Sequence, residues 1–518
     1  MSVLVLRHAR LVSIGSLWDL ARRWIAGLCI APACSVTGAQ TVVPASGIVA
    51  PAQGWASTVR HLEGALDDGA TYIFDLPLKW NGTLLLFSHG TARGPANPAR
   101  NVARDERAWL LDHGYALIGS SYASTGWAIE QAVPDQIATL DAFIQRFGKP
   151  SRTIAWGASM GGLVTLALVE RYPERFDGSL LLCASAAGSV GMMNQALDGA
   201  FTFKTLVAPD SDLPVQFSAD GDRATKQMTA WRQRLDQAQA TLEGRARIAL
   251  AATLAQVPPW IAPNSPRPTA TDFAGQQQQL YLGLLGATLL PRYDQVRRAG
   301  AEYSWNTGID YAAQLARSGR DALVRSLYRE AGLSLEQDLA ALAKAPRIEA
   351  KPDPVRYMKR NYVPSGRLVK PMLLVQAVAD PVTLVELSGD YARLAREAGH
   401  ADLVREAYVE RAGHCNFTRA ESIAALLTVE RRIENASWGV ERQDISLPEA
   451  MNTLSGSLGL DGSWFIEHHP TPFLRSCSTR EPYCPGEIPI RDSRPRLKSD
   501  NPGMNEQAVN TDKTLNIQ

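Results

Sequence analysis

The sequence lacks the features that mark nucleic-acid-binding, membrane-spanning and zinc-binding proteins. Its 518 residues carry a formal net charge of +1, and no basic stripe with interleaved aromatic residues is present, which argues against nucleic acid as a partner. No apolar run reaches the ~20 residues that a membrane-spanning helix needs. No Cys-x-x-Cys pair or His/Cys cluster suggests zinc. With 45% hydrophobic residues, the chain is long enough for a large core plus an inserted or second domain.

Residues 1–39 are predicted to be a signal peptide. Four arginines in the first 23 residues precede an apolar run at 24–36, and small residues at 37–39 suit a signal peptidase. A twin-arginine signal, a lipidated Cys34 and an ordinary buried helix are the alternatives. We therefore expect a secreted or periplasmic protein.

The six cysteines fit an exported protein. Two of them would leave with the signal, and four remain: Cys183, Cys415, Cys477 and Cys484. The last two bracket a short loop in a proline-rich tail, where an oxidising compartment favours a local disulfide.

Apolar runs typical of buried strands alternate with helical patterns along much of the chain. The predicted strands lie at 72–76, 83–88, 116–120, 153–156, 178–183, 371–377 and 403–409. The predicted helices between them lie near 103–113, 133–147, 384–398 and 419–434. This alternation predicts an α/β fold with a mostly parallel sheet covered by helices on both faces.

One long block interrupts the alternation and is mostly helical in pattern. We interpret it as an inserted cap or lid. The predicted organisation is therefore a core in two parts (40–187 and 368–436), the cap (188–367), and a C-terminal extension (437–518) that is partly disordered.

The most informative motif is the Gly-x-Ser-x-Gly in residues 157–162. It follows a predicted strand and precedes a helical pattern, which is the context in which this motif places a nucleophilic serine on a sharp turn. The turn strains the backbone of Ser159, so its neighbours must be small. The free N–H groups at the start of the next helix suit a developing anion. A tight turn with a purely structural serine is the alternative.

A serine nucleophile needs a base and an orienting carboxylate, and in a parallel sheet these lie at the carboxyl ends of strands. Asp380 follows the strand at 371–377, and His414 follows the strand at 403–409. His400 repeats the Ala-Gly-His context but precedes the last strand, so it lies at the wrong edge of the sheet. The order Ser159, Asp380, His414 therefore predicts a catalytic triad.

The oxyanion of a tetrahedral intermediate needs two backbone N–H donors. Met160, which follows the serine, is predicted to supply one, and Thr91 the other, because Gly90 allows its loop to approach. His89 is expected to be structural. Tyr122 either points its hydroxyl into the site or packs in the core.

Taken together, Ser88-His89-Gly90, Gly157–Gly162, Ala379-Asp380-Pro381-Val382 and Gly413-His414 resemble the α/β-hydrolase family. The resemblance covers the sheet regions on both sides of the insertion, about half of the chain. It implies an eight-stranded or similar sheet, a Ser/His/Asp triad, a cap over the site, and hydrolysis of esters or sometimes amides without a cofactor or metal.

A narrower resemblance is to secreted tannase and feruloyl-esterase-like enzymes. In these, one cysteine beside the serine and another beside the histidine form a disulfide. Here Cys415 follows His414, but Ala158 precedes Ser159, so half of the pattern is present. Pairing of Cys415 with Cys183 is not expected, because an intervening strand should hold their Cα atoms more than ~7 Å apart.

The sequence therefore predicts a secreted serine hydrolase that cleaves a carboxylic ester of a small molecule or polymer through an acyl-enzyme. A peptidase or amidase of the same fold and a binding protein on a hydrolase scaffold are the alternatives. The cap is expected to set specificity. Its candidate pocket aromatics, with one from the core, are Trp127, Trp260, Tyr281, Tyr303 and Trp305.

Overall fold

The fold is described from a computed structural model of the chain. The structure describes residues 59–92, 99–103, 105–216, 218–289, 292–439 and 445–471. The predicted signal peptide and the Cys477–Cys484 pair lie outside the described residues.

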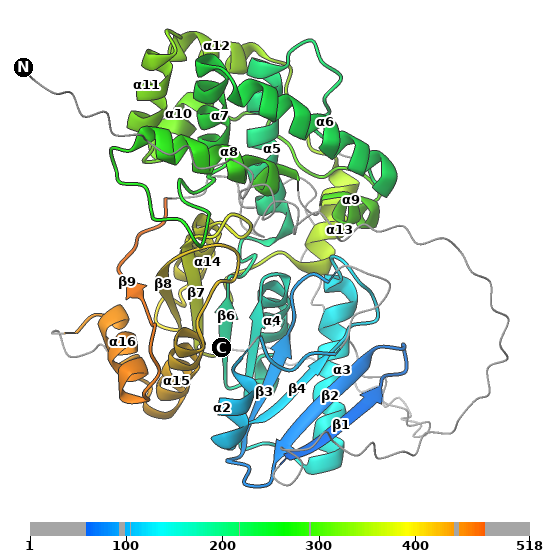
Figure 1. Ribbon diagram of the computed structural model, residues 1–518. Helices are drawn as coiled ribbons and strands as arrows, with labels where there is room; N and C mark the ends of the chain where they lie inside the picture. Colours follow the sequence, from blue (N-terminus) through cyan, green and yellow to red (C-terminus); the bar gives the residue numbers. More distant parts are fainter. Residues whose placement is uncertain are drawn as a thin grey trace, which may run out of the picture. The chain divides into compact units, whose positions relative to one another are not determined.

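The described part of the chain contains a nine-stranded sheet with helices on both of its faces (Figure 1). In chain order the strands are β1 (Val59–Ala65), β2 (Thr71–Pro77), β3 (Thr83–Ser88), β4 (Ala116–Ser120), β5 (Arg152–Ala158), β6 (Gly178–Leu182), β7 (Met372–Ala379), β8 (Val404–Ala412) and β9 (Phe465–Ile466). Their order across the sheet is β1-β2-β4-β3-β5-β6-β7-β8-β9. The six strands from β4 to β8 are mutually parallel, and antiparallel strands β1, β2 and β9 extend the two edges. The mostly parallel sheet is as predicted.

Buried side chains alternate along the strands between two apolar layers. Leu84 and Leu86 of β3 belong to one layer, and Leu85 and Phe87 to the other. The first layer is completed by α3 (Ile129–Phe147), α4 (Met160–Arg171) and α14 (Val385–Glu397). The second is completed by α2 (Arg107–Asp112), α15 (Arg419–Asn435) and α16 (Leu447–Ser457). Helices on both faces explain why these strands are apolar on both sides.

A helical segment connects β6 to β7, where the cap was predicted. A short 3-10 helix, η2 (Pro173–Arg175), lies before β6. The connecting helices are α5 (Gly188–Val207), α6 (Gly221–Gln239), α7 (Leu242–Leu254), α8 (Phe273–Leu289), α9 (Arg292–Ala299), α10 (Tyr311–Arg317), α11 (Asp321–Glu330), α12 (Leu335–Lys344) and α13 (Pro352–Tyr362). Part of this segment has an apolar core of its own, in which Phe203, Trp231 and Leu250 are buried. Its boundaries as a domain stay a prediction.

Helix α9 is bonded to the loop that follows β4. The Asp294 carboxylate accepts the Trp127 N–H at 2.7 Å, and Arg298 donates to the Ser124 hydroxyl at 2.8 Å and the Thr125 carbonyl at 2.6 Å. Arg298 also donates to Asp294 at 3.0 Å. Charge-assisted bonds of this kind are the stronger class of hydrogen bond, so they fix this helix against a loop of the sheet.

The described part of the C-terminal extension packs against the sheet. Strand β9 pairs with β8 through Val409 and Phe465, and the Glu410 N–H donates to the Trp464 carbonyl at 3.0 Å. Neither β9 nor the first edge strand, β1, was predicted. Strand β9 has only two residues, too few for a recognisable pattern, and β1 has exposed and half-buried positions but no buried one.

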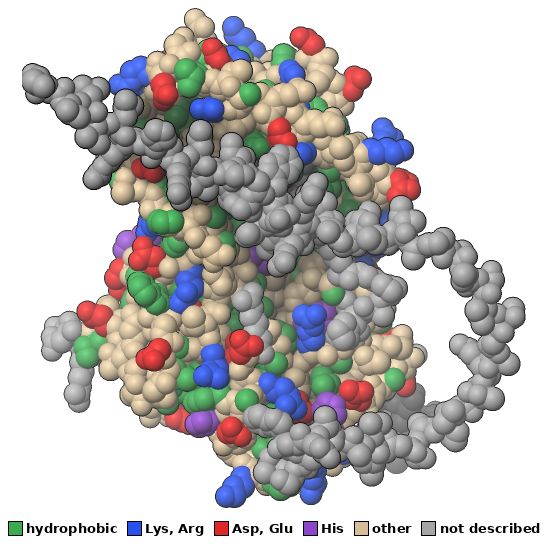
Figure 2. Space-filling view, viewed as in Figure 1, with side chains coloured by type: hydrophobic (Ala, Val, Ile, Leu, Met, Phe, Trp, Pro, Cys, Tyr) green, Lys and Arg blue, Asp and Glu red, His purple; other side chains and the backbone are tan. Residues whose placement is uncertain are grey.

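Charged side chains of both signs are interspersed over the face shown in Figure 2, in keeping with the small net charge. Among the described helices, none combines the length and the apolar character needed to cross a bilayer.

Candidate active site

Ser159 occupies the sharp turn between β5 and α4. Its backbone has φ +59° and ψ −126°, a conformation that is strained for a residue with a side chain. A Cβ added at Gly161 would lie 1.9 Å from the Ser88 carbonyl oxygen, and one at Gly157 would lie 2.3 Å from the Gly161 carbonyl oxygen. The two glycines of the motif are therefore sterically required.

The structure brings Ser159, His414 and Asp380 together at the carboxyl edge of the sheet. His414 Nε2 lies 2.9 Å from the Ser159 hydroxyl, and Nδ1 lies 2.9 Å from Asp380 Oδ2. The side chain of His414 is 25% exposed, whereas that of Asp380 is fully buried. An imidazole held between a hydroxyl and a buried carboxylate can accept the hydroxyl proton and be stabilised when it becomes positive.

Asp380 is held by several donors besides His414. The N–H groups of Val382 and Thr383 donate to Oδ1 at 2.8 and 3.0 Å, and the Thr383 hydroxyl donates to Oδ2 at 2.9 Å. The Cys415 N–H adds a longer bond to Oδ2 at 3.3 Å. These bonds fix the carboxylate beneath the imidazole. Thr383 was not singled out from the sequence, although its position three residues after Asp380 is the signal for such a turn.

Cys183 and Cys415 form a disulfide, so the expectation that they are unpaired is wrong. Strands β6 and β8 lie two spacings apart in the sheet, ~9.6 Å, but the Cα atoms of the two cysteines are only 5.3 Å apart. Each cysteine lies past the end of its strand with positive φ, +44° for Cys183 and +51° for Cys415. The two chains therefore leave the strand direction and converge next to the end of β7.

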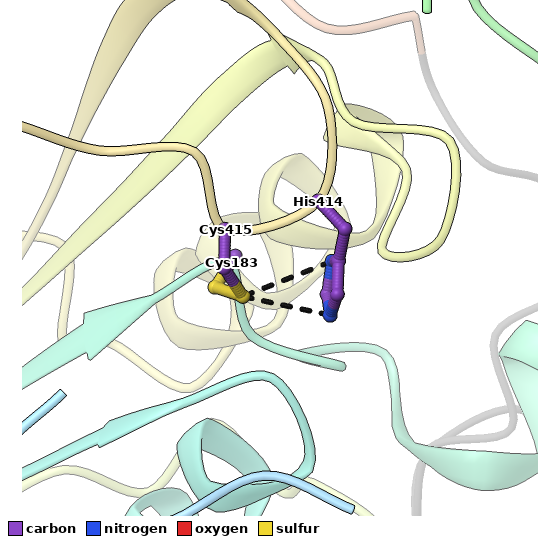
Figure 3. A group of neighbouring side chains, drawn as sticks. All are labelled: Cys183, His414 and Cys415. Carbon is purple, nitrogen blue, oxygen red and sulfur yellow. Dashed lines mark hydrogen bonds between the residues drawn. A yellow bond between two sulfur atoms is a disulfide. The ribbon is translucent and has the colours of Figure 1, made fainter. Parts of the chain in front are cut away.

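The disulfide lies against the imidazole of His414 (Figure 3). Cys415 Sγ is 3.5 Å from Nε2 and 3.7 Å from Nδ1. Cys183 is fully buried, so the bond anchors the residue beside His414 to the interior of the sheet.

One cluster of possible metal ligands occurs within the described ranges, and it consists of Cys183, His414 and Cys415. Both sulfur atoms are joined in the disulfide and are not thiolates. The imidazole bonds Ser159 and Asp380. These three residues therefore do not fit a metal site in this state of the protein.

The loop after β3 lies against Ser159, as expected for residues that approach an oxyanion. A Cβ added at Gly90 would lie 3.0 Å from Ser159 Cβ and 3.5 Å from its hydroxyl oxygen. Thr91 lies next to the start of α4, because its hydroxyl contacts Met160 Sδ at 3.5 Å. Met160 is the first residue of α4, so its N–H belongs to the unpaired donors of a helix start.

Tyr122 is buried and bonds the loop after β3 rather than presenting a free hydroxyl. Its hydroxyl donates to the His89 carbonyl at 3.0 Å, and its ring stacks on the His89 ring with centroids 4.0 Å apart. Burial lowers the pKa of His89, and the positive charge of Arg100 acts in the same direction. His89 therefore packs beneath the loop and has a structural place there. The hydrogen bonds of His400, His61 and His113 are with residues other than Ser159.

A buried carboxyl group supports the segment that carries Tyr122. Asp135 accepts the Ala123 N–H at 2.8 Å. Burial and a hydrogen bond with Asp68 raise the pKa of Asp135 to about 7, and the same bond lowers the pKa of Asp68. One proton is thus held between the two carboxyl groups in the folded protein.

This pair is expected to make stability depend on pH. Between about pH 4 and 7 the folded chain keeps a proton that an unfolded Asp135 would release, so the free energy of unfolding should fall as the pH rises through this window. The substitution Asp135→Asn keeps both hydrogen bonds without the proton. We expect it to raise the free energy of unfolding at pH 8 by about 1 kcal/mol and to flatten the slope between pH 5 and 7.5 in denaturant titrations. Asp67→Asn, at an exposed neighbouring position, is the control, and an unchanged slope in Asp135→Asn would contradict this assignment.

A cavity of about 140 Å³ opens beside Ser159. Its wall contains apolar side chains from β3, β6 and the loop after β8, the disulfide residue Cys415, and two charged residues, Arg100 and Glu106.

The aromatic residues that the sequence suggested as pocket candidates are not among the residues that line this cavity. Trp127, Tyr303 and Trp305 are instead buried in the first apolar layer, and Tyr281 packs against the core of the helical segment. Arg100 lies in a polar loop, and no sequence pattern distinguishes it from the other charged residues of the chain.

Comparisons with known proteins agree with a hydrolase. The chain is 32% identical over 443 residues to an o-phthalyl amidase of Xanthobacter agilis, and the match covers 79% of this chain and 96% of that protein. A family model described as serine aminopeptidase, S33, matches residues 119–270.

Solved structures with a detected likeness include feruloyl esterase B from Aspergillus oryzae, at 14% identity over 73% of this chain and 80% of that one, with a TM-score of 0.35. A second is the 2-hydroxy-6-oxo-6-phenylhexa-2,4-dienoate hydrolase from Rhodococcus sp. strain RHA1, at 16% identity over 72% and 100%, with a TM-score of 0.33.

Proposed function

This chain belongs to the α/β-hydrolase family, and on that premise we propose that it hydrolyses carboxylic acid derivatives through an acyl-enzyme formed on Ser159. The observation that carries the proposal is the chain of bonds from the Ser159 hydroxyl through His414 to the buried Asp380. This is the arrangement that activates a serine hydroxyl in unrelated hydrolases.

The proposed reaction has two halves. Ser159 Oγ attacks the carbonyl carbon while His414 Nε2 accepts the hydroxyl proton, and Asp380 holds the imidazole in the tautomer that this transfer needs. The oxyanion forms next to the N–H groups of Met160 and Thr91, and the loss of one such donor typically costs ~2.7–4 kcal/mol. His414 then protonates the leaving alcohol or amine. Water activated by His414 cleaves the acyl-enzyme, which releases the acid and restores Ser159.

Two classes of bond are candidates. Hydrolysis of a carboxylic ester is the prediction from the sequence. Cleavage of an amide is the second candidate, because the relative from Xanthobacter agilis is named for an amidase and is aligned over 96% of its length. A 4-nitrophenyl ester and the 4-nitroanilide of the same aromatic acid distinguish the two, since only the leaving atom differs.

The proposal includes export of the protein. The Cys183–Cys415 disulfide suits an oxidising compartment, as does the predicted signal peptide. A small-molecule substrate agrees with the modest size of the cavity beside Ser159.

Labelling with a fluorophosphonate tests the proposed nucleophile. We expect one equivalent of the probe to be incorporated and to map by peptide mass spectrometry to the segment that contains Ser159, because these probes phosphonylate activated serines. Heat-denatured protein is the control and should stay unlabelled. Labelling of a different residue, or none in the native protein, would contradict the proposal.

A further inference from the structure

The cavity beside Ser159 matches a single aromatic ring in size. Its volume is about 140 Å³, close to the ~150 Å³ of an engineered apolar cavity that binds benzene in another protein. The side chains of Phe87, Leu182 and Phe417 supply apolar walls, and Ala103 and Ala158 leave room between them. An acyl group that extends from a carbonyl at Ser159 into this space would therefore be ring-sized and largely apolar.

One charged side chain of the cavity wall, that of Arg100, has no ion-pair partner among the described residues. Arg100 lines the cavity, is exposed, and makes no ion pair within the part of the chain that the structure describes. Its charge acts on the His89 ring, which places it close to the loop that contacts Ser159. Glu106, the other charged residue of the wall, is buried and has interactions of its own, and the remaining polar side chains, those of His89, Ser159 and Ser422, carry no acidic group.

We propose that Arg100 binds a carboxylate carried by the acyl part of the substrate, so that the preferred substrates are half-esters or half-amides of an aromatic dicarboxylic acid. This inference rests on the proposed function of Ser159. A guanidinium can bond both oxygens of a carboxylate, and Arg100 lines a cavity whose apolar walls suit the ring. The amidase relative from Xanthobacter agilis is named for an o-phthalyl group, which agrees with this chemistry.

The recognition would act on specificity rather than on the chemical step. Arg100 is a residue of the cavity wall, and no hydrogen bond joins it to Ser159, His414 or Asp380. Removal of its charge should therefore weaken binding of a carboxylated substrate and leave the reaction of a neutral one intact. A residue needed only for the fold of the loop would affect both substrates alike.

Two pairs of substrates with the same leaving group test the proposal. Phenyl hydrogen phthalate is compared with phenyl benzoate, and N-phenylphthalamate with benzanilide, after subtraction of the uncatalysed rates. We expect wild-type kcat/KM to favour the carboxylated member by about ten-fold or more. The substitution Arg100→Gln should lower kcat/KM for that member by about 10- to 100-fold, mainly through KM, as expected for a lost charge-assisted pair. It should change the neutral member by less than about two-fold.

Two further variants complete the test. Arg100→Lys should restore part of the preference, and Arg60→Gln, at an exposed position on β1, should leave it unchanged. A parallel fall for both members of a pair, or an unchanged preference in Arg100→Gln, would overturn the assignment of Arg100. Failure of the proposed function would give a different result from failure of the Arg100 assignment. In that case Ser159 would not be labelled by a fluorophosphonate, and turnover would persist in the Ser159→Ala variant.

Discussion

The substitution Ser159→Ala is expected to lower kcat/KM by about 10⁴-fold or more while the protein stays folded. Loss of a serine nucleophile from a comparable triad costs about 10⁶-fold in kcat in another hydrolase. Alanine has the same Cβ as serine, so the strained turn at φ +59° is no harder to form. The measurement is kcat/KM on an ester or amide that the wild type cleaves, together with thermal unfolding.

The control for this experiment is Ser457→Ala, an exposed serine on α16 whose hydroxyl bonds only the Leu454 carbonyl among the described residues. It should keep a wild-type rate. If Ser159→Ala retained more than about a tenth of the activity, Ser159 could not be the nucleophile. General acid–base catalysis alone typically contributes about 10²- to 10⁴-fold to the rate.

Removal of the Cys183–Cys415 disulfide is expected to lower the free energy of unfolding more than any other substitution discussed for this protein. The bond closes a loop between residues 232 positions apart. The chain-entropy model gives about 5 kcal/mol for such a loop, and measured effects reach about 2 to 5 kcal/mol. We expect the double substitution Cys183→Ala/Cys415→Ala to lower the melting temperature by several degrees and to reduce kcat, because Cys415 Sγ supports the His414 ring.

A reductant provides the matched control for the disulfide. Denaturant unfolding in the presence of dithiothreitol should lower the stability of the wild type towards that of the double variant. It should change the double variant far less, because the predicted Cys477–Cys484 disulfide would close only a short loop. Equal stability of the wild type and the double variant in the absence of reductant would contradict a stabilising role for the bond.

The sequence predicted the parts of the fold that depend on burial. Strands such as Thr83–Ser88 and Ala116–Ser120 have the predicted bounds because they are covered on both faces and are apolar throughout. The rule that functional groups follow the carboxyl ends of parallel strands selected Ser159, Asp380 and His414, which the structure brings within hydrogen-bonding distance. Their catalytic roles remain predictions for the experiments above.

The features that were missed depend on the path of the chain beyond regular elements. Strand spacing suggested that Cys183 and Cys415 lie too far apart, but positive φ angles at both cysteines turn their chains towards each other. Nothing in the identity of a cysteine signals such a conformation, which is more usual for glycine or asparagine. Arg100 is similar, because a single charge in a polar loop carries no periodic pattern.

Strand β9 also bears on the exposure of the backbone groups at one edge of the sheet. Through Phe465 and Ile466 it occupies part of the hydrogen-bonding edge of β8, and the side-chain amide of Asn452 on α16 holds it there by donating to the Phe465 carbonyl at 2.9 Å. An open strand edge is a template on which a second chain can add a strand. A shortened version that ended at the last residue of α15 would leave that edge of β8 bare, and we expect it to self-associate more readily than the full chain.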